Sequence, residues 1–185
     1  MNDEDKRMMA IMQNGNNGDH YFTMGPAVFL SDNELELAAR VGRVRNEMMN
    51  KMNLSSTNRN LPDKENMEIM AVAAEIAVAK YLNVYFEYRL PLVAGSCDMK
   101  LNDGRGVDVK FTTYGNGKLI VPVSKRNSCS VYVLAINNDG SSMFNIAGWA
   151  TADELFNDAN IVEMYGKKKY VMHQIQLSHI NQLKQ

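Results

Sequence analysis

Apolar residues recur every three or four positions in two segments of the first half of the chain, and this spacing predicts two helices. The first helix is expected over residues 31–52, because Ser31 and Glu34 form a capping-box pattern at its start. Its apolar face is expected to consist of Leu37, Val41, Val44 and Met48. The second helix follows Pro62 and continues to about Leu82. It is apolar almost all round, which is typical of a central helix packed closely on a sheet.

Beyond residue 83 the pattern changes to the short apolar and alternating runs that are typical of strands. The turn signal at residues 102–104 (Asn-Asp-Gly) joins two of these strands into a hairpin, and Thr151 and Glu154 begin a short late helix. The expected strands are 84–87, 97–101, 106–113, 118–123, 130–136, 142–149 and 169–176. This order of elements indicates a mixed α+β or α/β domain built on a single sheet.

The polar, Asn- and Gly-rich start of the chain differs from the rest, and it divides the sequence into two parts. Residues 1–30 are expected to form an acidic, partly flexible arm, and residues 31–185 a single domain. A chain of 185 residues, of which 45% are hydrophobic, is long enough to bury a core of its own.

Charge is distributed unevenly, although the formal net charge is only −1. Residues 1–39 carry two basic and seven acidic side chains, whereas residues 40–59 carry five basic and one acidic, and residues 100–126 six basic and two acidic. A globally basic nucleic-acid binder is therefore excluded, but a local phosphate-facing surface is not. The alternative interpretation is two solvated faces with no ligand.

Four side chains could carry chemistry. Asp108 and Lys110 alternate onto one face of an otherwise apolar strand, and Asp98 lies on the other arm of the expected hairpin. Two neighbouring carboxylates repel each other unless a cation lies between them, and oxygen ligands favour Mg²⁺ or Mn²⁺. Glu75 lies in the most apolar part of the second helix, where a lone carboxylate is costly to bury. Its partner could be Lys110, a metal, Lys80 or an arginine.

These residues resemble the motif of the PD-(D/E)xK, or restriction-endonuclease-like, nuclease superfamily. The matching residues are Glu75, Asp98 and the triplet Asp108-Val109-Lys110, within residues 63–136. Cys97 stands where the family usually has a proline before the first aspartate. Residues 148–155 are similar to the C-terminal part of small phage-encoded nuclease-like proteins. The resemblance implies a central mixed β-sheet flanked by helices.

The resemblance also implies a mechanism, the Mg²⁺-dependent hydrolysis of phosphodiester bonds in DNA, with RNA as a further substrate class. Asp98, Asp108 and the Val109 carbonyl would hold Mg²⁺ (or Mn²⁺), and Lys110 would position the attacking water or stabilise the developing charge. Glu75 would complete a second metal site or orient Lys110. Phosphates would be contacted by the basic residues Arg40, Arg43, Arg45, Lys118, Lys125 and Arg126. A homodimer is one expected state, because cleavage of two strands needs two sites.

Two other function classes compete with the enzyme. One is a catalytically inactive nuclease-fold protein that binds nucleic acid or a host protein, and the other is a structural virion or assembly protein. Cys97 and Cys129 are too few for a disulfide framework and lie in no zinc-binding spacing. Because neither a secretory signal nor an apolar membrane span is found, we expect a cytoplasmic protein with no membrane partner, in the host cytoplasm if it is phage-encoded.

Overall fold

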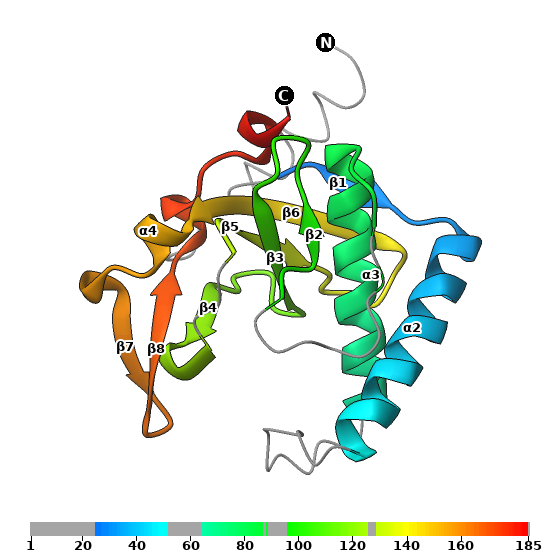
Figure 1. Cartoon of the computed structure of the whole chain (residues 1–185), viewed down its shortest axis with the longest axis horizontal. Coiled ribbons are helices and arrows are strands. Elements are labelled where there is room, and N and C mark those ends of the chain that lie inside the picture. The colour runs from blue at the N-terminus through cyan, green and yellow to red at the C-terminus, as the bar shows by residue number, and fades with distance from the viewer. Residues whose placement is uncertain (1–24, 52–63, 87, 89–95, 126–128, 185) are drawn as a thin grey trace, which may run out of the picture.

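The structure is a computed structural model that describes residues 25–51, 64–86, 88, 96–125 and 129–184. Three helices are found in this part of the chain: α2 (Asp32–Lys51), α3 (Lys64–Leu82) and α4 (Ala152–Leu155). The strands are β1 (Ala27–Phe29), β2 (Met99–Lys100), β3 (Gly106–Thr112), β4 (Leu119–Pro122), β5 (Val131–Ile136), β6 (Met143–Thr151), β7 (Ile161–Met164) and β8 (Lys167–Met172). The mixed α+β class is confirmed (Figure 1).

The start of α2 matches the capping box read from the sequence. The Ser31 backbone N–H donates to Glu34 Oε2 at 2.7 Å, and the Glu34 N–H donates to Ser31 Oγ at 3.4 Å. The expected apolar face of this helix is right at Val41, which is buried, but wrong at Leu37 and Val44, which are exposed. The buried stripe is Ala38, Val41, Gly42 and Arg45.

Helix α2 packs against α3, and α3 covers one face of the larger sheet (Figure 1). Gly42 makes the close approach of the two helices possible, since a Cβ at this position would lie 2.6 Å from Ile69 Cα. Small alanine side chains along α3 serve the same purpose at the interface with the sheet. The helix pair is therefore held close to the sheet by residues that occupy little space.

The strands form two sheets, so the expectation of a single sheet was wrong. The larger sheet has the order β1-β6-β5-β3-β2, with β3 and β5 parallel and the other neighbours antiparallel. The smaller sheet, β4-β8-β7, is antiparallel. Strand β4 joins β8 rather than β3, and the loop before β4 is held by Gln174, whose Nε2 donates to the carbonyls of Gly115 and Gly117 at 2.8 and 2.9 Å.

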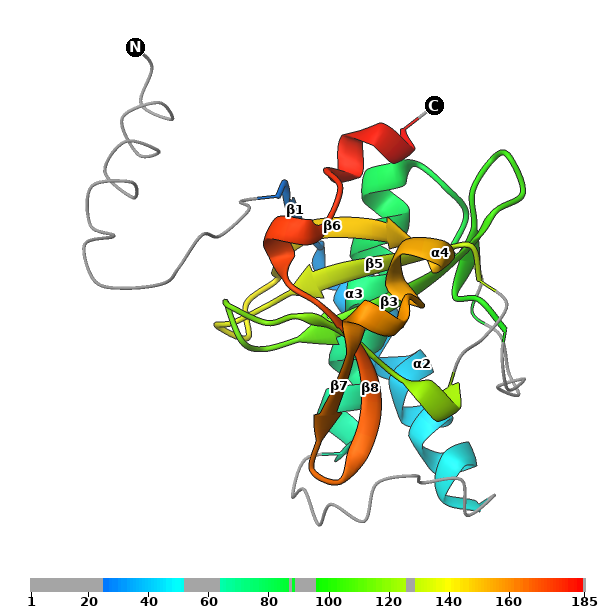
Figure 2. The ribbon, with the colours of Figure 1, turned by 90° about the vertical axis from the view of Figure 1, so that its left-hand side faces the viewer.

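The two faces of the larger sheet contribute to two hydrophobic cores. Val107 and Val109 of β3 pack toward α3, whereas Tyr132 and Leu134 of β5 pack toward the smaller sheet. Register pairs Asp108 with Tyr132 and Lys110 with Leu134, so both charged residues lie on the side of the smaller sheet. Figure 2 shows the smaller sheet on this side of β5 and β3.

Several expected boundaries need correction. Residues 1–24 of the expected arm lie outside the described residues, but its last part contains β1, which pairs with β6. Residues 84–86 form no strand, because α3 ends at Leu82, Asn83 follows with a positive φ of 54°, and the Val84 N–H donates back to the Ala79 carbonyl at the helix end. Strand β7 was not expected at all. Among the described helices, none has the length and apolar character needed to cross a membrane.

Candidate active site

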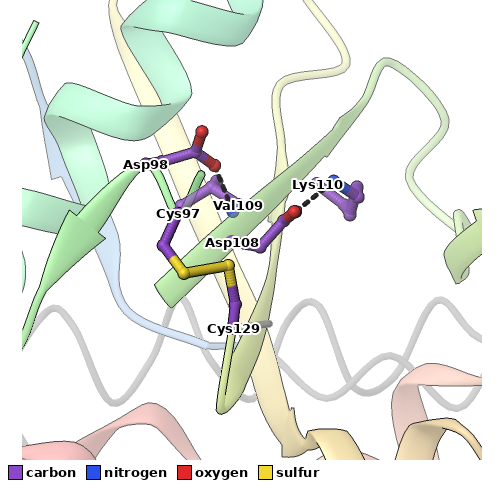
Figure 3. The surroundings of a disulfide bond; sticks show 6 residues. All are labelled: Cys97, Asp98, Asp108, Val109, Lys110 and Cys129. Atoms are coloured by element: carbon purple, nitrogen blue, oxygen red, sulfur yellow. Dashed lines mark hydrogen bonds and ion pairs between the residues drawn. A yellow bond between two sulfur atoms is a disulfide. The ribbon is translucent and has the colours of Figure 1, made fainter. Parts of the chain in front are cut away.

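Asp98 lies at the edge of β3, where β2 no longer covers it. Strand β2 pairs only with the first two residues of β3, and the chain before β2 carries Asp98 alongside the next part of that edge. Asp98 Oδ2 accepts a hydrogen bond of 2.7 Å from the Val109 N–H (Figure 3). The Asp98 N–H donates to the Val107 carbonyl at 2.8 Å. The N–H and C=O of one strand residue point the same way, so the Val109 carbonyl also faces this edge.

Asp108 and Lys110 form an ion pair on the face of β3 that lies toward the smaller sheet. Their positions, two residues apart, place both side chains on one side of β3, and the Lys110 ammonium donates to Asp108 Oδ1 (Figure 3). Asp108 is only 6% exposed, whereas Lys110 is partly exposed. The Lys110 ammonium could therefore contact a water molecule or a phosphoryl oxygen that enters from solvent.

Glu75 is buried and its partner is an arginine, which was one of the alternatives open from the sequence. Arg45 Nη1 donates to Glu75 Oε1 at 2.7 Å, and each residue is 5% exposed. Lys80, another alternative, instead binds Glu34 and the Phe29 carbonyl. Among the described residues, Glu75 Oε2 and Arg45 Nε have no hydrogen-bond partner.

The carboxylates are close enough to perturb one another electrostatically. Burial raises the pKa of Asp98 to about 8, and the negative charges of Glu75 and Asp108 contribute to the rise. Burial also raises the pKa of Glu75, although the hydrogen bond from Arg45 acts in the opposite direction. Glu75, Asp98 and Asp108 are therefore electrostatically coupled, although Asp108 projects from the face of β3 opposite the one that α3 covers.

A fourth carboxylate, Glu68, extends this cluster along α3. Burial raises the pKa of Glu68, and the nearby charge of Arg45 opposes the shift. Burial alone would lower the pKa of Arg45, but its hydrogen bond and charge interaction with Glu75 outweigh it, so the pKa is raised. Glu68 was not identified from the sequence. Its spacing of seven residues from Glu75, which places both side chains on one face of the helix, could have indicated it.

The residues offer oxygen ligands of the kind that Mg²⁺ and Mn²⁺ prefer. Three carboxylates and a backbone carbonyl are available, and the buried Glu75 Oε2 lacks a hydrogen-bond donor within the described chain. However, no three His, Cys, Asp or Glu side chains of that part of the chain are already grouped closely enough to hold a metal ion. The chemistry of the donors therefore fits a hard cation, whereas Asp108 and Glu75 pair with Lys110 and Arg45.

A disulfide adjoins the cluster, and sequence reasoning missed it. Cys97, directly before Asp98, is bonded to Cys129, which lies just before β5, with 5.6 Å between the two Cα atoms (Figure 3). The bond passes close to Gly106, where a Cβ would come within 2.4 Å of Cys97 Sγ. The two cysteines are 32 residues apart, and no local pattern joins them. The disulfide links the Asp98 segment covalently to the parallel neighbour of β3.

Of the expected phosphate-binding residues whose side chains the structure describes, three are exposed and one is buried. Arg40 and Arg43 are exposed on α2 and pair with Glu36 and Glu65, and Lys118 is exposed before β4. The prediction for Arg45 was wrong, because this residue is buried in an ion pair with Glu75 and cannot contact a phosphate. For the remaining two, the backbone of Lys125 lies in a 3₁₀ turn, and Arg126 is outside the described residues.

The comparisons with known proteins add no family to this picture. No protein-family model matches the chain, and neither the curated proteins nor the solved structures include a match to it.

Proposed function

We propose that this chain is a metal-dependent endonuclease of the PD-(D/E)xK type that hydrolyses phosphodiester bonds of DNA. The observation that carries the proposal is that Asp98 binds the Val109 peptide at the uncovered edge of β3 and is electrostatically coupled to Asp108, which pairs with Lys110 on the adjoining face of the same strand. The raised pKa of Asp98 supports it, because carboxylates that repel each other and are poorly solvated gain most from a bound cation.

In this proposal each residue has a separate task. Asp98, Asp108 and the Val109 carbonyl would hold Mg²⁺ or Mn²⁺, which when bound would polarise the phosphoryl group and acidify a water molecule. Lys110, partly exposed at the end of the pair, would hold the attacking water or stabilise charge on a phosphoryl oxygen. Glu75, directed by Arg45, would complete the acidic wall of the site.

The test is cleavage by the purified full chain with Mg²⁺, Mn²⁺ or EDTA. Substrates should include supercoiled, linear, single-stranded and branched DNA, and an RNA strand, because the site does not specify the substrate's shape. Asp108→Asn and Lys110→Met should each abolish cleavage while the far-UV circular dichroism stays unchanged. Asp103→Asn, an exposed carboxylate in the adjacent turn, is the matched control and should cleave normally. Cleavage that persists in EDTA or in both site variants would refute the proposal.

A second candidate is a nuclease-fold protein without activity that binds nucleic acid or a host protein. It is favoured by the observation that basic side chains already neutralise Asp108 and Glu75. Binding of DNA without cleavage under either metal would select this alternative. In both cases the proposed setting is the cytoplasm, with DNA as partner, and a homodimer remains a proposal for sedimentation analysis.

A further inference from the structure

The β7–β8 hairpin extends away from the two hydrophobic cores. Two residues, Tyr165 and Gly166, form its turn, and both have positive φ angles, 53° and 70°, as a type I′ turn requires. Figure 1 and Figure 2 both show the tip of this hairpin pointing away from the five-stranded sheet. A tyrosine is an unusual residue for a left-handed conformation, which Gly, Asn and Asp adopt at lower cost.

One face of the hairpin carries cations and exposed apolar groups together. Register pairs Val162 with Lys169 and Met164 with Lys167, so these four side chains share a face. Tyr165 is 87% exposed, and the Lys169 Nζ lies 5.9 Å from the centre of its ring. Within these two strands no carboxylate is on this face. We call this surface, made of Val162, Met164, Tyr165, Lys167 and Lys169, the hairpin face.

The opposite face of the hairpin has a different character. Lys168 lies directly opposite Glu163 in the strand register, so its charge has a neighbour of opposite sign. Nearer the cores, the same face carries Ile161 and Tyr170, which pack into the core between the sheets. The unbalanced positive charge of the hairpin is thus confined to the hairpin face, next to an exposed aromatic ring.

Cationic side chains beside an exposed aromatic ring are the combination that binds single-stranded nucleic acid. Lysines neutralise backbone phosphates, and an aromatic ring stacks on an unpaired base of any sequence. A duplex offers only stacked bases, which the ring cannot reach without unpairing them. The combination of groups therefore fits an unpaired strand better than a duplex.

We propose that the hairpin face binds a single-stranded segment of nucleic acid, with Lys167 and Lys169 on successive phosphates and Tyr165 stacked on a base. The identity of the partner rests on the proposed nuclease function. The inference goes beyond that function in naming a second contact surface, on the smaller sheet, and an unpaired strand as its ligand. None of these residues belongs to the carboxylate cluster, so their loss should weaken binding and leave the bond-breaking step intact.

Binding is measured by fluorescence anisotropy with a labelled single-stranded oligonucleotide and its duplex, in EDTA so that no cleavage occurs. The Lys167→Gln/Lys169→Gln double variant should lower the slope of log affinity against log salt by about 1.4, since each phosphate contact on a single strand contributes about 0.7. Tyr165→Ala should weaken single-strand binding about tenfold and duplex binding much less.

Two matched variants serve as controls. Tyr165→Phe keeps the ring and should bind the single strand as the unmodified chain does. Lys168→Gln removes one charge from the opposite face of the same hairpin and should leave the salt slope unchanged. An equal loss per charge in Lys168→Gln, or unchanged affinity in the hairpin-face variants, would overturn the proposal. Binding to anionic phosphatidylserine vesicles in place of the oligonucleotide would overturn it too.

Failure of this proposal and failure of the nuclease function are distinguishable. If the unmodified chain cleaves DNA but the hairpin-face variants bind the single strand normally, the hairpin proposal is refuted and the nuclease stands. If the chain binds through the hairpin face but cleaves nothing under either metal, the enzyme is refuted and the hairpin proposal stands.

Discussion

Asp98→Asn should abolish most of the loss of stability that the unmodified protein undergoes as the pH rises from 5 to 8. The pKa of Asp98 is raised from 3.8 to about 8, so the folded protein keeps this proton over a range in which the unfolded chain has released it. The free energy of unfolding therefore falls as the pH rises through that window, and the loss is complete above the folded pKa. An asparagine does not titrate, and its side-chain oxygen can still accept from the Val109 N–H.

The size of the effect follows from the shift. Each pK unit corresponds to about 1.4 kcal/mol, which sets an upper limit of about 6 kcal/mol for a shift of this size. Asp98 is only partly buried, and water and neighbouring charges relax around it when it ionises. We therefore expect a difference of about 2–3 kcal/mol between the pH dependences of the two proteins.

Urea unfolding between pH 5 and 9 in EDTA, followed by circular dichroism, measures this difference directly. Asp103→Asn is the control: the backbone hydrogen bond from Arg105 and its ion pair lower the pKa of Asp103, so its contribution changes only below this pH range. Parallel curves for Asp98→Asn and the unmodified chain would refute the account of a buried, mutually repelling carboxylate cluster.

Three further perturbations test the surroundings of the site by urea or thermal unfolding. Arg45→Met should cost about 3–5 kcal/mol because it leaves Glu75 buried without its partner, and adding Glu75→Gln should recover most of the loss. Gly42→Ala should cost about 1–3 kcal/mol by forcing the two long helices apart; an unchanged midpoint would contradict the close packing. Reduction of the Cys97–Cys129 disulfide, which closes a loop over a separation of 32 residues, should cost about 4 kcal/mol, and a melting curve insensitive to reductant would contradict this.

Local chemistry was predicted well from the sequence because its causes lie within a few residues. The capping boxes at Ser31–Glu34 and Thr151–Glu154 depend on side chains three positions apart, and both form as expected. The hairpin turn before β3 depends on Gly104, whose φ of 89° suits glycine. Asp108 and Lys110 share a face because strand alternation alone places them there.

Partners distant in the chain could not be predicted in the same way. The alternating pattern of β4 does not indicate which strand it pairs with, and its partner in the structure, β8, lies about 50 residues further along the chain. The Cys97–Cys129 bond also depends on tertiary structure. Arg45 did leave a signal, since it follows Ala38 by seven residues on one helix face, but its charge led to its interpretation as a surface residue.

The buried charges near Asp98 are costly for the fold, and this cost bears on function. When an ion pair such as Arg45–Glu75 is buried, the free energy lost by removing both charges from water is about as large as the attraction between them. In this pair, one oxygen and one nitrogen also have no hydrogen-bond partner within the described residues. Apolar residues of similar volume would fill the α2–α3 interface at least as well. Placed beside Asp98, the pair instead keeps a negative charge next to a carboxylate whose pKa it raises. The repulsion between these carboxylates does not stabilise a purely structural interface. In a site that binds a cation, the repulsion increases the affinity, because the bound positive charge removes the repulsion.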